Sequence, residues 1–338
     1  KQGGRASKGP KLERGLADPG VQAIGRDPRG RRMVRFGARA CQLTWPFPGG
    51  FPGAWIREPP GPYPGGVSTP VRYRMSLMAG WLADRWLPTF LRAPIFKAYC
   101  WATGADWREA RGPLHIYPSL GRFFVRELRE GLRPIDSDPS ALVSPVDGTI
   151  QDLSPIEAGT ILQAKGHRYS VSDLLAGVGE ASELEGGQAW TIYLGPKDYH
   201  RIHSPCAGTL VRARWVAGTR YSVQPRVLAR RMVLPINERC PLRIETEHGP
   251  IYLVLVGALI VGRIKVVGLP SQGDQRPNPG MPLQRGGELA RFEMGSTIVL
   301  LVPKGSALPT PNLAPGQTVR LGSRIGTWSI AATPGTQP

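Results

Sequence analysis

The sequence lacks an uncharged apolar run of the length that a membrane-spanning helix needs, about 18 residues or more. Its longest such stretch, Ile251 to Gly262, has 12 residues and contains two glycines. A stretch of this length and composition is typical of a buried strand. The sequence therefore predicts no spanning helix, while 338 residues suffice for one large or two ordinary domains.

Cysteine is scarce and scattered. The four residues, Cys41, Cys100, Cys206 and Cys240, form no Cys-x-x-Cys pair. This spacing excludes a disulfide framework and a thiolate metal site, and it indicates a reducing compartment. Cys206 is close to two histidines in the sequence, but a small packed thiol is the better interpretation.

Acidic residues are scarce in residues 1–74, which hold 14 Lys or Arg against 4 Asp or Glu. The same residues contain 14 Gly and 11 Pro, a composition that predicts a disordered basic extension. An organelle transit peptide would be Arg-rich too, but the Pro and Gly content argues against one. Alternatively, Met75 or Met78 could be the true first residue of the translated protein. We favour a solvated tail and expect no nucleic-acid partner.

Aromatic and basic side chains are concentrated in residues 75–107. Pro88 and Pro94 are predicted to break this segment into short helical pieces. A segment of this kind, too short to span, is typical of a membrane interface, and the alternative is a helical cap on the following domain. We interpret residues 75–135 as a membrane-associating helical region. Its tryptophans are Trp81, Trp86, Trp101 and Trp107, interleaved with Arg85, Arg92 and Lys97.

Beyond Gly112, short β-branched stretches alternate with Gly and Pro turns, a pattern that predicts a strand-rich domain. Helices are expected over residues 119–129, 170–176 and 223–232. Strands are expected over residues 189–194, 208–215, 251–256, 259–267, 297–302 and 318–321.

A weak internal repeat relates residues 144–150 to residues 204–210, which share Ser, Pro, Gly and Thr at matching positions. Each copy reads as a turn that leads through glycine into a strand. Two similar β-lobes facing each other would form a sandwich-like core. We therefore predict an α+β, mainly β fold, with the catalytic domain over residues 136–330. Ala207 stands in the second copy where Asp147 stands in the first.

Four side chains in three separated turns carry candidate chemistry: Asp147, His200, His203 and Ser296. Glycine at Gly295 leaves its carbonyl unshielded, so the Ser296 hydroxyl could attack it once a base removes the proton. Acid, base and nucleophile roles are recognised by geometry and not by order in the chain. The two histidines could share a metal if they lay on a helix, but a loop fits the neighbouring proline better, and we expect no metal.

Six motifs occur in order, and together they resemble the phosphatidylserine decarboxylase family over roughly residues 76–330. Met294 and Ala290 stand where the family usually has Leu and Gly, and both are small changes. The motifs are Ser144–Gly148, Leu162–Ser170, Asp198–Pro205, Asn237–Arg239, Val256–Ala258 and Gly287–Thr297.

The resemblance implies a proenzyme that cuts itself into a β chain ending at Gly295 and an α chain beginning at residue 296. Ser296 would become a covalent pyruvoyl group, the electron sink for converting phosphatidylserine to phosphatidylethanolamine and carbon dioxide in phospholipid biosynthesis. Asp147 would hold His203 in the tautomer that takes the proton from Ser296. His200 would be the partner of the substrate during decarboxylation, although the two histidine roles could be exchanged.

The implied partners are phosphatidylserine in the membrane and the two chains of one precursor, and we allow for a homodimer. We expect peripheral attachment to a bacterial inner membrane, with the mitochondrial inner membrane as the alternative. Two other classes stay open. A lipoyl-type carrier module needs an exposed lysine at a hairpin tip, and none is evident. A Ser-His-Asp hydrolase keeps its serine internal in a Gly-x-Ser-x-Gly elbow, which Ser296 does not have.

Overall fold

The computed structural model describes residues 78, 80–163, 167–228, 230–258, 263–293 and 296–329, with two short strands in residues 21–36. The chain divides into two units, Lys1–Pro59 and Pro60–Pro338. The first unit contains an antiparallel pair, β1 (Val21–Arg26) and β2 (Arg32–Phe36). The rest of the basic extension over residues 1–74 lies outside the described residues, so its predicted disorder stays a prediction.

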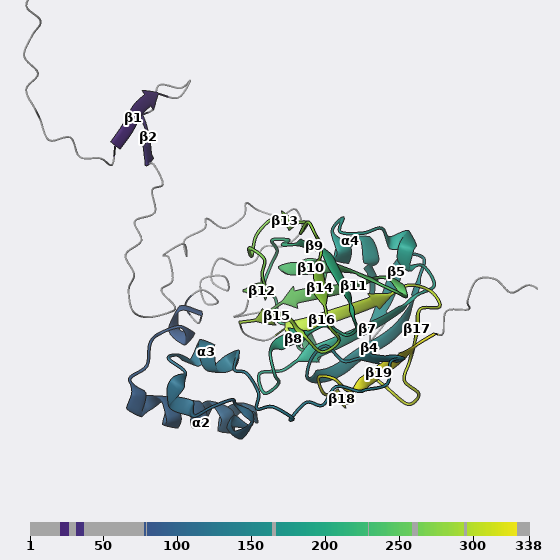
Figure 1. Ribbon diagram of the computed structural model, residues 1–338, viewed down its shortest axis with the longest axis horizontal. Helices are drawn as coiled ribbons and strands as arrows, with labels where there is room; N and C mark the ends of the chain where they lie inside the picture. The colour runs from purple at the N-terminus through teal and green to yellow at the C-terminus, as the bar shows by residue number, and fades with distance from the viewer. Residues whose placement is uncertain are drawn as a thin grey trace, which may run out of the picture. The chain divides into compact units, whose positions relative to one another are not determined.

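One large antiparallel sheet organises the second unit (Figure 1). Its strands follow the order β13, β9, β10, β11, β16, β7, β4, β5 and β6, while β14 pairs with β9 and β18 pairs with β4. The strands are β4 (Gly148–Glu157), β5 (Thr160–Gln163), β6 (His167–Ser170), β7 (Gln188–Leu194), β9 (Gly208–Arg214), β10 (Arg239–Thr246), β11 (Gly249–Gly257), β13 (Asp274–Gln275), β14 (Met281–Leu283), β16 (Ser296–Val302) and β18 (Thr318–Val319).

Two three-stranded sheets accompany it. One has the order β12 (Ile264–Val266), β15 (Glu288–Phe292) and β8 (Arg201–His203). The other has the order β17 (Ala307–Pro309), β19 (Arg324–Trp328) and β3 (Ala141–Val143). Together these sheets confirm the predicted mainly β fold.

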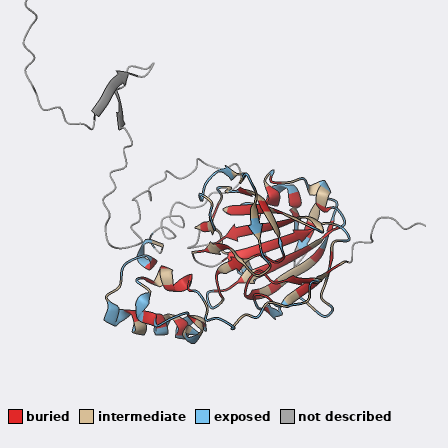
Figure 2. Ribbon diagram, viewed as in Figure 1, coloured by how far each residue is buried: buried red, intermediate tan, exposed pale blue. Residues whose placement is uncertain are grey.

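The central strand β16 is buried on both faces, and the strands around it form the buried interior of Figure 2. Its alternate residues belong to two apolar clusters, with Ile298 in the first and Val299 in the second. The first cluster also contains Ile202 and Phe292, so the β12–β15–β8 sheet covers that face. The second contains Leu174, so the short helix α4 lies over the other face. This layering confirms the sandwich-like core.

The predicted helices are present but shorter, because turns rather than long helices connect the strands. None of the helices in the described part of the chain is long and apolar enough to cross a membrane. Of the strand predicted over residues 259–267, only β12 is described, and residues 259–262 lie outside the described part. The helices are α2 (Thr89–Thr103), α3 (Leu120–Phe124), α4 (Val171–Leu175) and α5 (Pro225–Leu228), with 3-10 turns η1 (Trp107–Glu109), η2 (Leu114–Ile116) and η3 (Ala181–Leu184).

The prediction that Pro94 ends a helix is wrong, because α2 runs through it without interruption. Pro88 does limit a helix, since it is the N-cap residue of α2. Pro94 removes one backbone hydrogen bond, at a cost of about 3 kcal/mol in a helix interior. Burial of Phe96 and Cys100 on one face of α2 offsets this cost, because tertiary packing supplies most of the stability of a helix.

The internal repeat of the sequence is also a structural repeat. In each copy the serine hydroxyl donates a hydrogen bond of 2.7 Å to the carbonyl two residues on, from Ser144 to Val146 and from Ser204 to Cys206. The two turns also bond to each other, since the His203 amide donates to the Pro145 carbonyl at 2.9 Å. The two copies therefore lie side by side.

Candidate active site

Ser296 is the first residue of β16 and is completely buried. It pairs in register with Leu194 of β7 on one side and Gly257 of β11 on the other. Its hydroxyl has no hydrogen-bond partner among the described residues, although Met294 and Gly295 lie outside them. A buried unpaired hydroxyl costs about 1–3 kcal/mol, and this one directly follows a glycine, so it is free to react with the preceding carbonyl.

The end of β7 places Asp147 near Ser296. Strand β4 begins at Gly148 and pairs with β7 through Thr149 and Tyr193, on the edge opposite β16. Since neighbouring strands are about 4.8 Å apart, the starts of β4 and β16 are roughly 10 Å apart. A Cβ at Gly148 would lie 2.5 Å from the Tyr193 carbonyl oxygen, so only glycine permits this close approach.

His200 is bound to the same end of β7. Its Nε2 lies 2.9 Å from the carbonyl oxygen of Gly195, the residue directly after that strand. Its own carbonyl accepts a 3.0 Å hydrogen bond from the Phe292 amide, four residues before Ser296. The imidazole stacks on Phe124 with ring centroids 4.1 Å apart. These contacts hold His200 between the end of β7 and strand β15, which leads toward Ser296.

Burial lowers the pKa of His200 to about 3, so the ring is neutral near pH 7. Because a carbonyl only accepts, Nε2 carries the proton and donates it to Gly195. Nδ1 is then an unprotonated acceptor, and it has no partner among the described residues. The ring offers one free lone pair inside the protein.

His203 is also neutral, since burial lowers its pKa. Its Nδ1 donates to the Gly286 carbonyl at 2.9 Å, and its Nε2 lies 3.3 Å from the Tyr199 hydroxyl, which is placed to donate to it. The Gly286 carbonyl, and not Asp147, therefore fixes the His203 tautomer, which corrects the hydrogen bond inferred from the sequence. His203 pairs in register with Glu288, whereas His200 is bonded to Phe292, which is four residues nearer to Ser296 in the chain.

Asp147 is buried and fully engaged by other groups. Arg133 donates to it through Nε and Nη2, the latter at 2.6 Å from Oδ2, and the Leu321 amide donates at 2.8 Å. Arg133 also binds Glu109 at 2.9 Å. Asp147 acts on His203 through its charge, which opposes the effect of burial on the pKa of that ring.

The structure thus places His200 and Ser296 at the end of β7, with the Asp147 turn at the start of the neighbouring strand β4. His203, at the far end of β8 from His200, is bonded to that turn through the Pro145 carbonyl. Sequence reasoning missed Arg133, which no local pattern separates from the other arginines of the chain. It also assigned no role to Tyr199, although this residue lies inside the quoted histidine motif.

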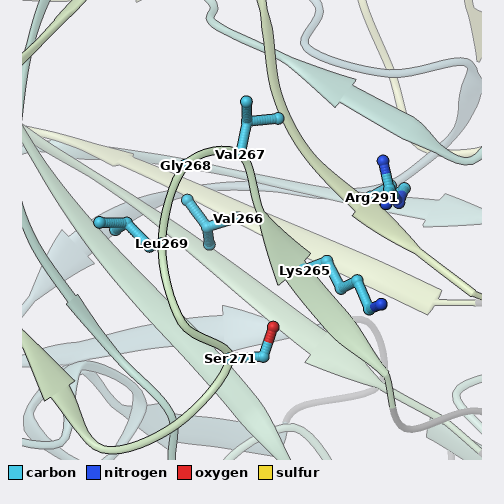
Figure 3. A pocket seen from close by; sticks show the side chains of 7 residues that line it. All are labelled: Lys265, Val266, Val267, Gly268, Leu269, Ser271 and Arg291. Atoms are coloured by element: carbon cyan, nitrogen blue, oxygen red, sulfur yellow. The ribbon is translucent and has the colours of Figure 1, made fainter. Parts of the chain in front are cut away.

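A hollow of about 340 Å³ lies beside this region, at the turn after β12 (Figure 3). Lys265 and Arg291, which pair in register across β12 and β15, line it together with Ser271. Lys265 lies 3.4 Å from the carboxylate of Glu293. None of the four predicted site residues lines the hollow, so it is a neighbour of the candidate site and not its centre.

Comparisons with known proteins agree with the site. The phosphatidylserine decarboxylase family matches residues 120–327. The chain is 38% identical over 269 residues to a phosphatidylserine decarboxylase proenzyme of Marinobacter nauticus, covering 76% of this chain and 94% of that protein. It is 37% identical to that of Alcanivorax borkumensis, covering 76% and 93%, and 39% identical to that of an Anaeromyxobacter species, covering 72% and 90%. With its repeated β-turns, buried serine and paired histidines, the chain belongs to the phosphatidylserine decarboxylase family.

Proposed function

We propose that this phosphatidylserine decarboxylase, which makes phosphatidylethanolamine from phosphatidylserine, cuts itself between Gly295 and Ser296. The observation that carries the proposal is the Ser296 hydroxyl, buried at the start of β16 with no partner among the described residues. The neighbouring Thr297 hydroxyl is likewise unpaired in the described part of the chain, but of the two only Ser296 directly follows a glycine, whose unshielded carbonyl its hydroxyl could attack.

The cleavage needs no outside oxidant or reductant. A base takes the proton of the Ser296 hydroxyl, whose oxygen attacks the Gly295 carbonyl carbon while the peptide nitrogen leaves as an amine. The resulting ester loses its Cα proton, and the Cβ–O bond breaks to release Gly295 as a carboxylate. The dehydroalanine that is left adds water and loses ammonia, which yields the pyruvoyl group.

His203 is the proposed base for this step, because its neutral ring keeps a lone pair on Nε2. Removal of the proton makes an imidazolium, which the negative charge of Asp147 favours. Tyr199 must release Nε2 for Ser296 to take its place. His200, with its free Nδ1 at the end of β7, is the proposed partner of the substrate.

The position of Ser296 suits a pyruvoyl group. An uncharged ketone fits this fully buried strand start, which shares its face with the apolar side chains of Leu194 and Ile298. When present, the group supplies an electron sink for loss of carbon dioxide. The surrounding residues keep water away from it, and the bond from His200 to Gly195 holds that ring at the same end of β7.

The two chains produced by the cut would stay together. Strand β16 begins at residue 296 and pairs with β7 along its length and with β11 along most of it. Both partners belong to the larger chain, so separation would break the centre of the sheet. We therefore expect an αβ complex that only denaturation separates.

A matched pair of substitutions tests the proposal. Ser296→Ala should run as one uncut 36.7 kDa chain on a denaturing gel and release no carbon dioxide from phosphatidylserine. Thr297→Val removes the neighbouring buried hydroxyl, also unpaired among the described residues, and should still be cut. Splitting of the alanine variant, or carbon dioxide release by it, would refute self-cleavage at Ser296.

We also propose peripheral attachment to a membrane, with the bacterial inner membrane favoured over the mitochondrial one. Large apolar side chains are exposed along residues 78–101, among them Phe90 at 77% and Trp101 at 88%. The Arg85 guanidinium lies 3.5 Å from the centre of the Trp81 ring. Exposed aromatic rings with adjacent cations are suited to a lipid interface.

Flotation with anionic liposomes tests this attachment. The unchanged chain should float, whereas Phe90→Ser with Trp101→Ser should leave most protein in the soluble fraction. Leu308→Ser, which removes a 66% exposed apolar side chain from β17, is the control and should float normally. If the unchanged chain stays entirely soluble, the attachment proposal fails.

A further inference from the structure

Arg126 is the most unusual buried cation outside the residues assigned so far. Its residue exposure is 1%, yet Nε and Nη1 have no hydrogen-bond partner among the described residues. Its one described side-chain contact is with the Phe123 ring, 5.3 Å from the guanidinium carbon to the ring centre. Burial of an unpaired guanidinium is costly, so such a group is retained where an anion arrives to pair with it.

Arg126 lies where the helical region meets the turn that carries His200. Burial chiefly lowers the pKa of His200, and the charge of Arg126 lowers it further. Burial raises the pKa values of Asp198 and Tyr99, and the same charge opposes both shifts. The Tyr99 hydroxyl also donates to the Pro196 carbonyl at 2.6 Å, which ties α2 to this turn.

No described carboxylate neutralises Arg126, since none of the ion pairs among the described residues includes it. Asp198 accepts a hydrogen bond from the Gly195 amide at 2.7 Å instead. Arg133 and Arg201, by contrast, each bind two carboxylates. Arg126 therefore acts on Asp198 through its charge but forms no ion pair with a carboxylate in the described part of the chain.

Two different environments meet at Arg126. Arg126 lies over Phe123, which stacks on Phe96 of α2, the helix that also carries exposed aromatic rings. Its charge also reaches His200, which is bound to the strand end that pairs with Ser296. A phospholipid with its acyl chains toward α2 and its amine at residue 296 would hold its phosphate between these points.

We propose that Arg126 binds the phosphodiester of the phospholipid and positions the head group at residue 296, an inference that rests on the proposed function. A guanidinium fork matches phosphate oxygens in geometry as well as charge. The carboxylate is the poorer partner, because its negative charge passes into the electron sink as neutral carbon dioxide leaves. A cation bound to the carboxylate would therefore stabilise the ground state more than the transition state. The phosphate keeps its charge throughout.

Kinetics with a water-soluble, short-chain phosphatidylserine test the assignment. Arg126→Gln should raise KM about 10- to 100-fold, the effect of losing a charged hydrogen bond, with kcat within about threefold. Arg126→Lys, which keeps the charge without the fork, should lie between this variant and the unchanged enzyme. Arg129→Gln, an exposed neighbour on the same segment, is the control and should not change KM.

Two inhibitors distinguish phosphate from carboxylate. Glycerophosphoethanolamine has the phosphodiester but no carboxylate. In Arg126→Gln its inhibition constant should rise by the same factor as KM. Free serine has the carboxylate but no phosphate, and its inhibition constant should not change. If Arg126→Gln weakened inhibition by free serine but not by glycerophosphoethanolamine, Arg126 would bind the carboxylate and the proposal would be overturned. An unchanged KM would overturn it as well.

Self-cleavage monitors folding in these variants, because a misfolded precursor would stay uncut. If neither Arg126 variant is cut, the proposal is tested by thermal stabilisation of the unchanged enzyme on ligand binding. Glycerophosphoethanolamine should then raise its Tm more than serine does at equal concentration, and no such difference would overturn the proposal. Failure of the unchanged chain to cut itself would instead defeat the proposed function.

Discussion

Arg133 joins two carboxylates from separate segments of the chain, Glu109 and Asp147. The side chains of Arg133 and Asp147 are 8% and 9% exposed, so both charges depend on each other for compensation. Removing one member of such a pair leaves an uncompensated buried charge. Arg133 is therefore a positioning residue for Asp147.

We predict that Arg133→Gln lowers the free energy of unfolding by about 3–5 kcal/mol. Urea unfolding should be measured in the uncut Ser296→Ala chain, so that both proteins are single chains. Arg111→Gln, which breaks an ion pair whose arginine is 62% exposed, should cost less than about 1 kcal/mol. Equal losses in the two variants would contradict the role of Arg133.

His200 should make stability depend on pH. Burial lowers its pKa to about 3 in the folded chain, whereas an unfolded histidine titrates near pH 6.5. Between these values the unfolded chain binds the extra proton, so stability is present above about pH 6.5 and falls as the pH is lowered toward 3.

The predicted slope for this one group is about 1.4 kcal/mol per pH unit below pH 6. His200→Gln should lose that part of the slope when urea unfolding is measured in the Ser296→Ala chain between about pH 7 and pH 5. His203, whose pKa burial also lowers, should give a smaller effect of the same sign. A slope that His200→Gln leaves unchanged would show that the ring is not buried in the neutral form.

At the scale of elements, the strands and the repeated turns could be predicted because their signals are local. Short β-branched stretches between Gly and Pro turns identified β7, β9, β11 and β16, and the repeat identified the paired lobes. The continuity of α2 through Pro94 could not be predicted, because it depends on packing across the helical region.

The candidate site divides in the same way. Asp147, His200, His203 and Ser296 stand in recognisable turns, so sequence reasoning could name them. The bond from His203 to Gly286 spans 83 residues, and no local pattern reports contacts of that range. Arg126 and Arg133 are equally invisible from the sequence, since burial and partners distinguish them from other arginines.

The repeat offers a matched test of two turns. A Cβ at Gly148 would lie 2.5 Å from the Tyr193 carbonyl, and a Cβ at Gly208 would lie 2.6 Å from the Glu245 carbonyl. We predict that alanine at either position destabilises the Ser296→Ala chain by about 1–3 kcal/mol in urea unfolding.

In the cleavable chain, only Gly148→Ala should slow self-cleavage beyond its effect on stability, because only that turn contains Asp147. Gly208→Ala supplies the control for lost stability, with Ala207 in the matching position. Slowing of cleavage to the same extent in both variants, measured on a denaturing gel over time, would contradict a specific role of the first turn.

At the scale of the whole molecule, the proposed cut would leave one sheet composed of strands from two chains. β16 supplies the central strand, while most of the strands around it precede residue 296. A cut at its first residue would leave this pairing intact and put the new chain end inside the core, at the end of β7 to which His200 is also bound. Folding would thus create the reactive position before the chemistry occurs there.

The most direct test is the intact mass of the denatured, unchanged protein. The account predicts two chains that together correspond to residues 1–295 and 296–338, the smaller one lighter by one ammonia than a chain beginning with serine. Its first residue should react with a carbonyl reagent and resist stepwise N-terminal degradation. A single uncut chain with full decarboxylase activity, or a smaller chain with a free serine amine, would contradict the account.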